Sequence, residues 1–254
     1  MSKLDIHIVP VLKDNYVYLL REPDSGAVGI VDPSVAGPVI AALDKLGWKA
    51  THILNTHHHN DHTGGNAELK VHYKAIVVGP MADQARIPGI DVALADGDTF
   101  HFGKTTAKVF DVPGHTRGHI AYWFPDSQAA FTGDTLFLMG CGRLFEGTPA
   151  QMWNSLSKLK GLPAETRIYC GHEYTQSNAR FALSIEPNNP ALVARAKRVD
   201  EKRARNETTI PGTMGEELAT NPFLRADIRE MQRAMGTKGD VETFAAIRSA
   251  KDNF

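Results

Sequence analysis

Four imidazoles and one carboxylate lie within six consecutive positions of this 254-residue chain, from His57 to His62. The preceding residues His52–Leu54 predict a strand, so the chain leaves a sheet edge in extended form, and the side chains of His57 and His59 point the same way. Imidazoles this close would repel one another if protonated, and a divalent metal ion keeps them neutral. The segment therefore predicts a metal site; histidines that merely fill a surface loop are the alternative.

Three further residues of ligand type, His115, Asp134 and His172, each follow a glycine that comes just after a predicted strand. The three strands are Ala107–Val112, Ala129–Thr132 and Arg167–Cys170. A glycine there lets the backbone turn sharply, so that ligands from separate strands can converge. Each signal is weak alone, because an aspartate after a glycine is more often a turn residue. Together with His57, His59, Asp61 and His62 they supply five histidines and two aspartates, about the number that two adjacent metal ions need. Imidazole and carboxylate ligands without cysteine suit Zn²⁺, and also Fe or Mn.

The elements that must position these residues follow from the apolar pattern. Further strands are expected at Ile6–Leu12, Tyr16–Leu20, Val28–Val31, Ile76–Val78 and Ile120–Phe124, with helices at Pro38–Leu46 and Gln151–Leu159. After Tyr174, helices are expected at Ala179–Ile185, Ala191–Asn206, Thr213–Ala219, Leu224–Met235 and Asp240–Ser249. Many strands with few interspersed helices predict an α/β (α+β) fold of two sheets covered by helices. The change from a strand-rich to a helix-rich pattern divides the chain into a metal-binding region, 1–173, and a helical region, 174–254, that packs on it.

Two local patterns in the helical region carry specific expectations. Thr213 and Glu216 have capping-box spacing, which predicts a helix start. The stretch Arg195–Arg205 mixes both charge signs at helical spacing and is interpreted as a solvated helix face.

The composition excludes several classes of function. A hydrophobic content of 42%, a charged content of 22% and a net charge of -1 give no reason to expect nucleic-acid or membrane binding. The N-terminus has no signal-peptide core, and no apolar run reaches transmembrane length, so a cytoplasmic location is expected. Cys141 and Cys170 are too few for a disulfide framework or a four-thiolate zinc site, and are interpreted as small buried thiols. Without a coiled-coil seam, a monomer is expected.

The signature H-x-H-x-D-H and the remote ligand residues resemble the metallo-β-lactamase superfamily. The resemblance implies an αββα sandwich with two divalent metal ions at one edge. It implies one ion held by His57, His59 and His115, a second held by Asp61, His62 and His172, and Asp134 bridging both, so that Asp61 and Asp134 are catalytic. Asp32 matches an acidic position that supports the ligands from behind; a plain turn aspartate is the alternative. His58 and His119 are left with orienting or structural roles.

Four further segments indicate which family within this superfamily the chain resembles. They are GCGRLFEGT from Gly140, GHEYT from Gly171, NPFLR from Asn221 and IRSAKDNF at the C-terminus. In this order they are similar to the glyoxalase II (hydroxyacylglutathione hydrolase) family along essentially the whole chain. That family implies hydrolysis of S-D-lactoylglutathione to D-lactate and glutathione by hydroxide bound to two metal ions, the second step of methylglyoxal detoxification. The implied substrate contacts are Arg143, Tyr174, Arg248 and Lys251; without the resemblance the last two would be read as exposed basic residues. Phe145 departs from branches of the family that carry tyrosine, which predicts weaker glutathione binding.

Three rival functions remain at this stage. A persulfide dioxygenase shares the scaffold but uses a single iron, and has no obvious use for a second metal set or for Arg248 and Lys251. An RNA-processing nuclease would need a basic RNA-gripping arm, against which the near-neutral charge argues. A non-catalytic interaction module is the third.

Overall fold

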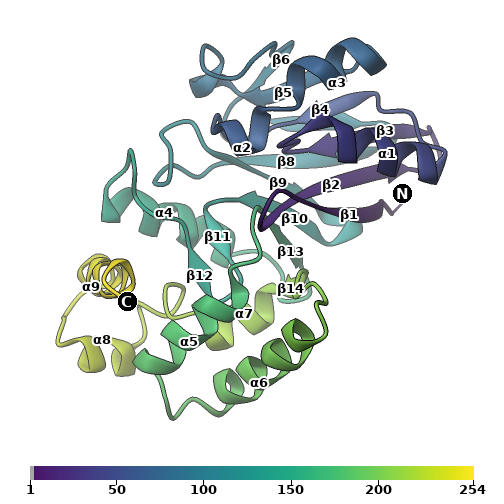
Figure 1. Cartoon of the computed structure of the whole chain (residues 1–254). Coiled ribbons are helices and arrows are strands. Elements are labelled where there is room, and N and C mark those ends of the chain that lie inside the picture. The colour runs from purple at the N-terminus through teal and green to yellow at the C-terminus, as the bar shows by residue number, and fades with distance from the viewer. Residues whose placement is uncertain (1–2) are drawn as a thin grey trace. The chain divides into compact units, whose positions relative to one another are not determined.

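The computed structural model describes residues 3–254, which form two compact units (Figure 1). The first unit contains the residues up to Asp111 together with Thr116–Gly133. The second contains Val112–His115 and Asp134–Phe254. None of the helices within residues 3–254 combines the length and apolar character that a membrane span requires.

One sheet of the first unit has the strand order β1-β2-β3-β4-β5-β6. Its strands are β1 (Asp5–Val11), β2 (Asn15–Glu22), β3 (Ala27–Val31), β4 (His52–Leu54), β5 (Ile76–Pro80) and β6 (Val92–Leu94). β1, β2 and β3 pair antiparallel, whereas β3 to β6 pair parallel. Parallel neighbours need a crossover connection, and the helices α1 (Ala36–Leu46) and α3 (Asn66–Tyr73) supply it. Val39 and Leu43 of α1 and Leu69 of α3 are fully buried in the core that this sheet shares with the helices.

The parallel pairing positions part of the candidate site. The carboxyl ends of parallel strands meet at one edge of a sheet, so the residues after β3 and after β4 emerge side by side. Asp32 directly follows β3, and its backbone N–H donates to the carbonyl oxygen of Leu54 at the end of β4 (3.0 Å). The histidine-rich segment then begins three residues beyond that point, at His57.

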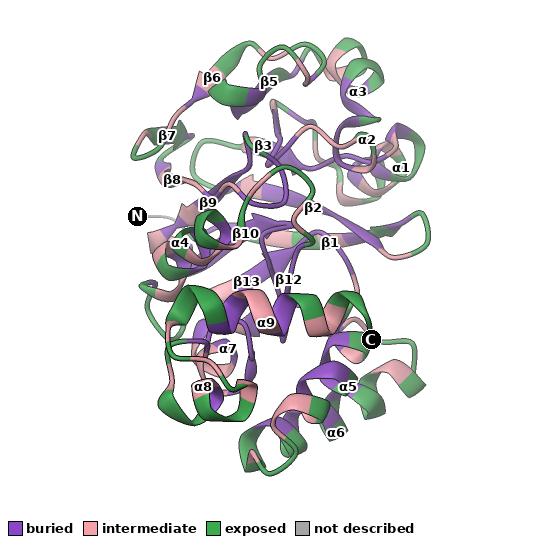
Figure 2. Ribbon diagram, turned by 90° about the vertical axis from the view of Figure 1, so that its left-hand side faces the viewer, coloured by how far each residue is buried: buried purple, intermediate pink, exposed green. Residues whose placement is uncertain are grey.

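The second sheet of this unit is an antiparallel meander that packs against the first. Within this unit it comprises β7 (Thr99–Phe102), β8 (Thr105–Asp111), β9 (Ile120–Phe124) and β10 (Ala129–Gly133). The rings of Tyr18 and Phe131 meet edge-on with centroids 5.4 Å apart, and the hydroxyl of Tyr122 donates to the carbonyl of Asn55 (2.9 Å). Figure 2 shows the strands of this unit largely in the buried colour, while the outer helices carry exposed stretches.

The second unit joins short strands to a set of helices. It contains β11 (Leu136–Phe137), β12 (Gly140–Cys141), α4 (Pro149–Lys160), β13 (Arg167–Cys170), α5 (Thr175–Ile185), α6 (Pro190–Ala204), β14 (Gly212–Thr213), α7 (Met214–Thr220), α8 (Arg229–Met235) and α9 (Asp240–Asp252). The helices α5 and α6 share a small core that includes Ala182 and Leu192. α9 packs on α4, where the rings of Trp153 and Phe244 lie 6.3 Å apart. Within this unit, α9 therefore packs on α4, which precedes the C-terminal helices in the sequence.

Most of the expected elements are present, and the mixed sheets with helices confirm the α/β (α+β) class. The capping box predicted at Thr213 and Glu216 starts α7. The expectation of a helix from Leu224 is wrong for its first turn, because α8 starts only at Arg229. The side chain of Asn221 accepts from the N–H of Phe223 (3.0 Å), and the segment 222–227 forms turns instead.

Candidate metal centre and substrate-binding residues

The first unit gathers four of the expected metal ligands. His57 and His59 follow β4, whereas Asp61 and His62 lie on the single turn α2 (Asn60–Thr63). His57 Nε2 lies 3.2 Å from His59 Nδ1, so the two rings converge as the extended backbone predicts. His62 Nε2 lies 3.6 Å from Asp61 Oδ2. His57 and His62 are buried.

Asp32 fixes which nitrogen of two histidines is available. Its Oδ1 accepts from the N–H of Thr56 (2.8 Å), and its Oδ2 accepts from the Thr56 hydroxyl (2.6 Å). That hydroxyl donates its only proton to the carboxylate, so its oxygen accepts from His57 Nδ1 (3.0 Å). His62 Nδ1 also donates to Asp32 Oδ2 (3.1 Å). Both rings therefore carry their proton on Nδ1 and present the Nε2 lone pair, which is the state a metal ion requires.

The second unit gathers the other three expected ligands. His115 Nδ1 lies 2.9 Å from the carbonyl oxygen of Arg143, which can only accept, so Nδ1 carries the proton and Nε2 presents a lone pair. This lone pair faces Asp134 Oδ2 at 3.5 Å, and His172 Nε2 faces the same oxygen at 3.3 Å. All three side chains are buried.

These donor sets fit divalent cations. Ring lone pairs and carboxylate oxygens that face one another at 3.3 to 3.6 Å are too far apart for good hydrogen bonds and would repel one another without a positive charge between them. Imidazole nitrogens and carboxylate oxygens, with ring tautomers set from behind by Asp32 and by a backbone carbonyl, are the surroundings in which proteins hold zinc, iron or manganese.

Glycines allow the close approaches around these ligands. Gly114, with φ of +150°, precedes His115, and a Cβ there would lie 2.9 Å from Met152 of α4. A Cβ on Gly142 would lie 1.9 Å from the carbonyl oxygen of Asp134. Residues with side chains at these positions would push the ligand loops apart, which explains the glycine that the sequence places before His115.

His58 and His119 lie behind the ligands. The His119 ring stacks on His57 with centroids 4.6 Å apart and planes 17° apart. His58 Nδ1 contacts the buried Asp83 (2.9 Å), whose other oxygen bonds the Arg86 guanidinium. Asp83 was not identified from the sequence; no local pattern links it to a histidine 25 positions earlier.

Three of the four expected substrate contacts converge in the second unit. Arg248 is buried and donates to the carbonyl of Cys141 (2.9 Å) and to Asp252 (2.9 Å), while Arg143 Nε lies 3.8 Å from the same Asp252 carboxylate. Burial, and to a smaller extent the neighbouring charges of Arg248 and Arg143, lower the pKa of Lys251. Three cations around one carboxylate leave a net positive charge, which suits a ligand with several carboxylates.

Tyr174 and Phe145 lie beside two of the expected metal ligands in the same unit. The Tyr174 ring stacks on His172 with centroids 4.7 Å apart and an interplanar angle of 1°. The Phe145 ring is largely exposed and lies 5.1 Å from that of His115. Asp252, which was not identified from the sequence, could have been found from its position four residues after Arg248, the spacing of an ion pair on a helix.

Comparison with known proteins assigns the chain to a family. The metallo-beta-lactamase superfamily model matches residues 12–172, and the model of the hydroxyacylglutathione hydrolase C-terminus matches residues 173–254. A protein of Methylococcus capsulatus named hydroxyacylglutathione hydrolase is 58% identical over 253 residues, covering 99% of each chain. The chain belongs to the hydroxyacylglutathione hydrolase family. A relative of the same name from Rhodospirillum rubrum is 55% identical over 256 residues and covers 100% of both chains.

Solved structures agree with this hydroxyacylglutathione hydrolase fold. The crystal structure of ETHE1 from Myxococcus xanthus has a TM-score of 0.70 at 25% identity, covering 96% of this chain and 90% of that one. The BLEG-1 B3 metallo-beta-lactamase has a TM-score of 0.67 at 22% identity and covers 87% of this chain and 99% of that one. The expected metallo-β-lactamase-like fold is therefore confirmed.

The two thiols of this hydroxyacylglutathione hydrolase family member are not nucleophiles. Neither forms a disulfide, and both are buried. Burial raises the pKa of Cys141 to about 11, against the opposing effect of Arg248, and burial also raises the pKa of Cys170 far above its usual range. A protonated thiol is a poor nucleophile, so the thioester hydrolysis of this family has to draw its nucleophile from water.

Proposed function

We propose that this protein hydrolyses S-D-lactoylglutathione to D-lactate and glutathione with two divalent metal ions. The observation that carries the proposal is the full-length match to relatives named hydroxyacylglutathione hydrolase, which includes the C-terminal segment 173–254. The division at residues 173 and 174 into catalytic and substrate-binding regions is part of the proposal.

In this proposal the two ions take the seven ligand residues expected from the sequence. One ion is assigned to His57, His59 and His115, the other to Asp61, His62 and His172, with Asp134 shared. The crystal structure of a relative, TTHA1623 in a di-iron-bound form, supports two metals on this fold (25% identity, TM-score 0.61). Bound divalent ions lower the pKa of water toward neutrality and polarise a carbonyl, which is the chemistry that thioester hydrolysis needs. Zinc suits the ligand set, and iron and manganese are compatible with it.

The chain's own residues bind and orient the substrate. The cations Arg143, Arg248 and Lys251 attract the glutathione carboxylates, and the Tyr174 hydroxyl offers a further donor. The exposed Phe145 ring beside His115 supplies an apolar wall without a donor, which supports the expectation of weaker glutathione binding. The thiolate that leaves is stable enough to need no general acid, because a thiol has a pKa near 8.5.

The persulfide dioxygenase alternative is less supported, because the full-length relatives carry the hydrolase name. A monomeric state and a cytoplasmic location stay predictions.

The test is the loss of thioester absorbance when metal-loaded protein is mixed with S-D-lactoylglutathione, with acetyl-coenzyme A as the thioester that lacks glutathione. We expect rapid hydrolysis of the first only. Oxygen consumption with glutathione persulfide and no thioester hydrolysis would support the dioxygenase instead.

Replacing Lys251 with methionine is expected to raise KM for S-D-lactoylglutathione by about tenfold and to leave kcat nearly unchanged, since a charged hydrogen bond to a carboxylate is worth about 1.5 kcal/mol. Lys238→Met, an exposed lysine of the same unit, is the control. Because the pKa of Lys251 is lowered, its charge is lost at lower pH than for an ordinary lysine, so KM of the wild type rises early on the alkaline side. An unchanged KM in the variant would contradict the assignment.

A further inference from the structure

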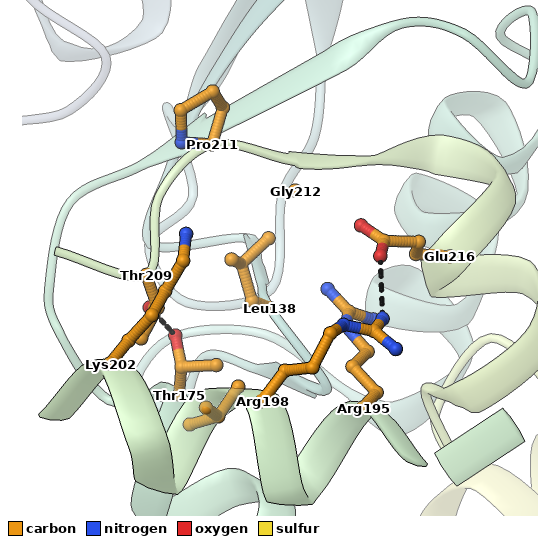
Figure 3. A pocket seen from close by; sticks show the side chains of 10 residues that line it. Leu138, Thr175, Arg195, Arg198, Lys202, Thr209, Pro211, Gly212 and Glu216 are labelled. Atoms are coloured by element: carbon orange, nitrogen blue, oxygen red, sulfur yellow. Dashed lines mark hydrogen bonds and ion pairs between the residues drawn. The ribbon is translucent and has the colours of Figure 1, made fainter. Parts of the chain in front are cut away.

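A second site candidate lies within the second unit, apart from the expected ligands and substrate contacts. A cavity of about 70 Å³ opens between α6, the segment 209–212 and the start of α7 (Figure 3). It is lined by Leu138, Thr175, Arg195, Arg198, Val199, Lys202, Thr209, Pro211, Gly212 and Glu216.

One face of α6 gives this cavity three cationic side chains. Arg195, Arg198 and Lys202 are spaced three and four positions apart, so they share a face of the helix. The interpretation of Arg195–Arg205 as a solvated helix face is therefore wrong for Arg195, which is 4% exposed. In Figure 3 the Lys202 ammonium stands at one side of the cavity, and the two guanidinium groups stand at the other.

The three cations differ in how far their charge is neutralised. The buried Arg195 pairs with Glu217 and donates to the Thr220 hydroxyl (2.6 Å). Arg198 pairs with Glu216 at 3.0 Å, but both side chains are about half exposed, and such pairs contribute little. Within residues 3–254, the Lys202 ammonium makes no hydrogen bond or ion pair; after the larger effect of Arg205, its charge also lowers the pKa of Glu207. The cavity lining itself contains one carboxylate, Glu216, but Glu217 neutralises the buried Arg195, so Lys202 supplies the net positive charge of the cavity.

The hydroxyl groups of Thr175 and Thr209, which line the cavity, belong to a hydrogen-bond network with the carboxylate of Glu173. The Thr209 hydroxyl donates its single proton to Glu173 (2.7 Å). In its contact with the Thr175 hydroxyl (2.7 Å), Thr209 is therefore the acceptor and Thr175 the donor. Glu173 also accepts from the Thr209 N–H (2.8 Å) and lies 3.7 Å from Arg203, so its charge is compensated there. Lys202 and the arginines are therefore the donors left to a ligand.

We propose that this cavity binds a phosphate dianion, either inorganic phosphate or the phosphoryl group of a small monoester. The Lys202 ammonium and the half-exposed Arg198 guanidinium attract a dianion more strongly than a singly charged carboxylate, and guanidinium and ammonium groups are the usual phosphate donors in proteins. The volume admits a group of a few heavy atoms. A side chain at position 212 would displace the Arg195 guanidinium, because a Cβ there would lie 2.7 Å from Arg195 Nη2. The site is independent of the proposed hydrolysis.

The experiment is titration calorimetry of the metal-loaded protein with inorganic phosphate at constant ionic strength, for the wild type, Lys202→Gln and Lys197→Gln. Lys197 lies on the same helix, is largely exposed and does not line the cavity, so it is the matched control. Phosphate that binds the metal ions contributes equally in all three proteins. We expect the Lys202 variant to bind phosphate at the cavity at least about tenfold more weakly, and the Lys197 variant to match the wild type.

Two further probes identify the source of the anion. Methyl phosphate that binds as well as inorganic phosphate would assign the site to monoesters, whereas weaker binding would assign it to the free ion. Acetate is expected to bind more weakly than either. The proposal would be overturned if both lysine variants bound phosphate equally well, or if the wild type bound no phosphate beyond that held by the metal ions. Acetate binding as tight as that of phosphate would also overturn it.

Discussion

Asp134→Ala is expected to release bound metal from the purified protein and to lower kcat/KM for S-D-lactoylglutathione by about a thousandfold or more. The Asp134 Oδ2 atom faces the Nε2 atoms of both His115 and His172, so the substitution removes an oxygen donor that both rings share. Losing the charge stabilisation that metal ions supply removes several kcal/mol, and about 4 kcal/mol corresponds to a thousandfold in rate. Metal content by plasma emission spectroscopy and steady-state kinetics measure the two effects.

Asp44→Ala is the control for Asp134→Ala, because Asp44 is an exposed aspartate of α1 far along the chain from any expected ligand. It should keep both the metal content and the rate. Adding excess Zn²⁺ should restore only a small part of the activity of Asp134→Ala. A metal-free variant that still hydrolyses the thioester at the wild-type rate would refute the role of Asp134 and, with it, the metal-dependent mechanism.

The parts of the fold that the sequence predicts best are those whose signal is local. His52–Leu54, Ile120–Phe124 and Arg167–Cys170 form strands with the predicted bounds, because compact apolar runs end at polar or glycine residues. Two-residue strands such as β11 and β12 have no period that a sequence can display. The first turn predicted for α8 failed because the side chain of Asn221 stabilises a turn there, which helical spacing does not register.

For the candidate site too, local sequence signals were predicted, whereas contacts between distant residues were not. The histidine-rich segment and the glycines before His115, Asp134 and His172 are visible in the sequence, since each loop must turn sharply after a strand. Asp252 was missed although it lies four residues after Arg248 on the same helix, a spacing that indicates an ion pair. Asp83 was missed because packing between elements brings its partner His58 to it. Arg195 was misjudged for the same reason: Glu217, 22 positions later, neutralises its buried charge. Spacing identifies which residues share a helix face, but not what covers that face.

Asp32→Asn is expected to weaken metal binding by about 10- to 100-fold while leaving the fold intact. Asp32 has a φ of +50°, a conformation that asparagine also tolerates, so the backbone can stay in place. The amide, however, has a single acceptor oxygen where the carboxylate accepts from the Thr56 N–H, the Thr56 hydroxyl and His62 Nδ1. An NH₂ group facing His62 Nδ1 favours the tautomer with its proton on Nε2, the nitrogen that would otherwise face the metal ion.

The measurement for Asp32→Asn is metal affinity by competition with a chromophoric chelator, with thermal unfolding to confirm that the fold is kept. Asp98→Asn is the matched control, because Asp98 also accepts from a backbone N–H, that of Ala95 (2.8 Å), in the same unit. A tautomer effect also predicts that the loss of affinity exceeds the loss of stability, since the three hydrogen bonds can partly re-form around the amide. Unchanged metal affinity in Asp32→Asn would mean that Asp32 is a turn residue with no influence on the histidine ligands, the alternative that the sequence left open.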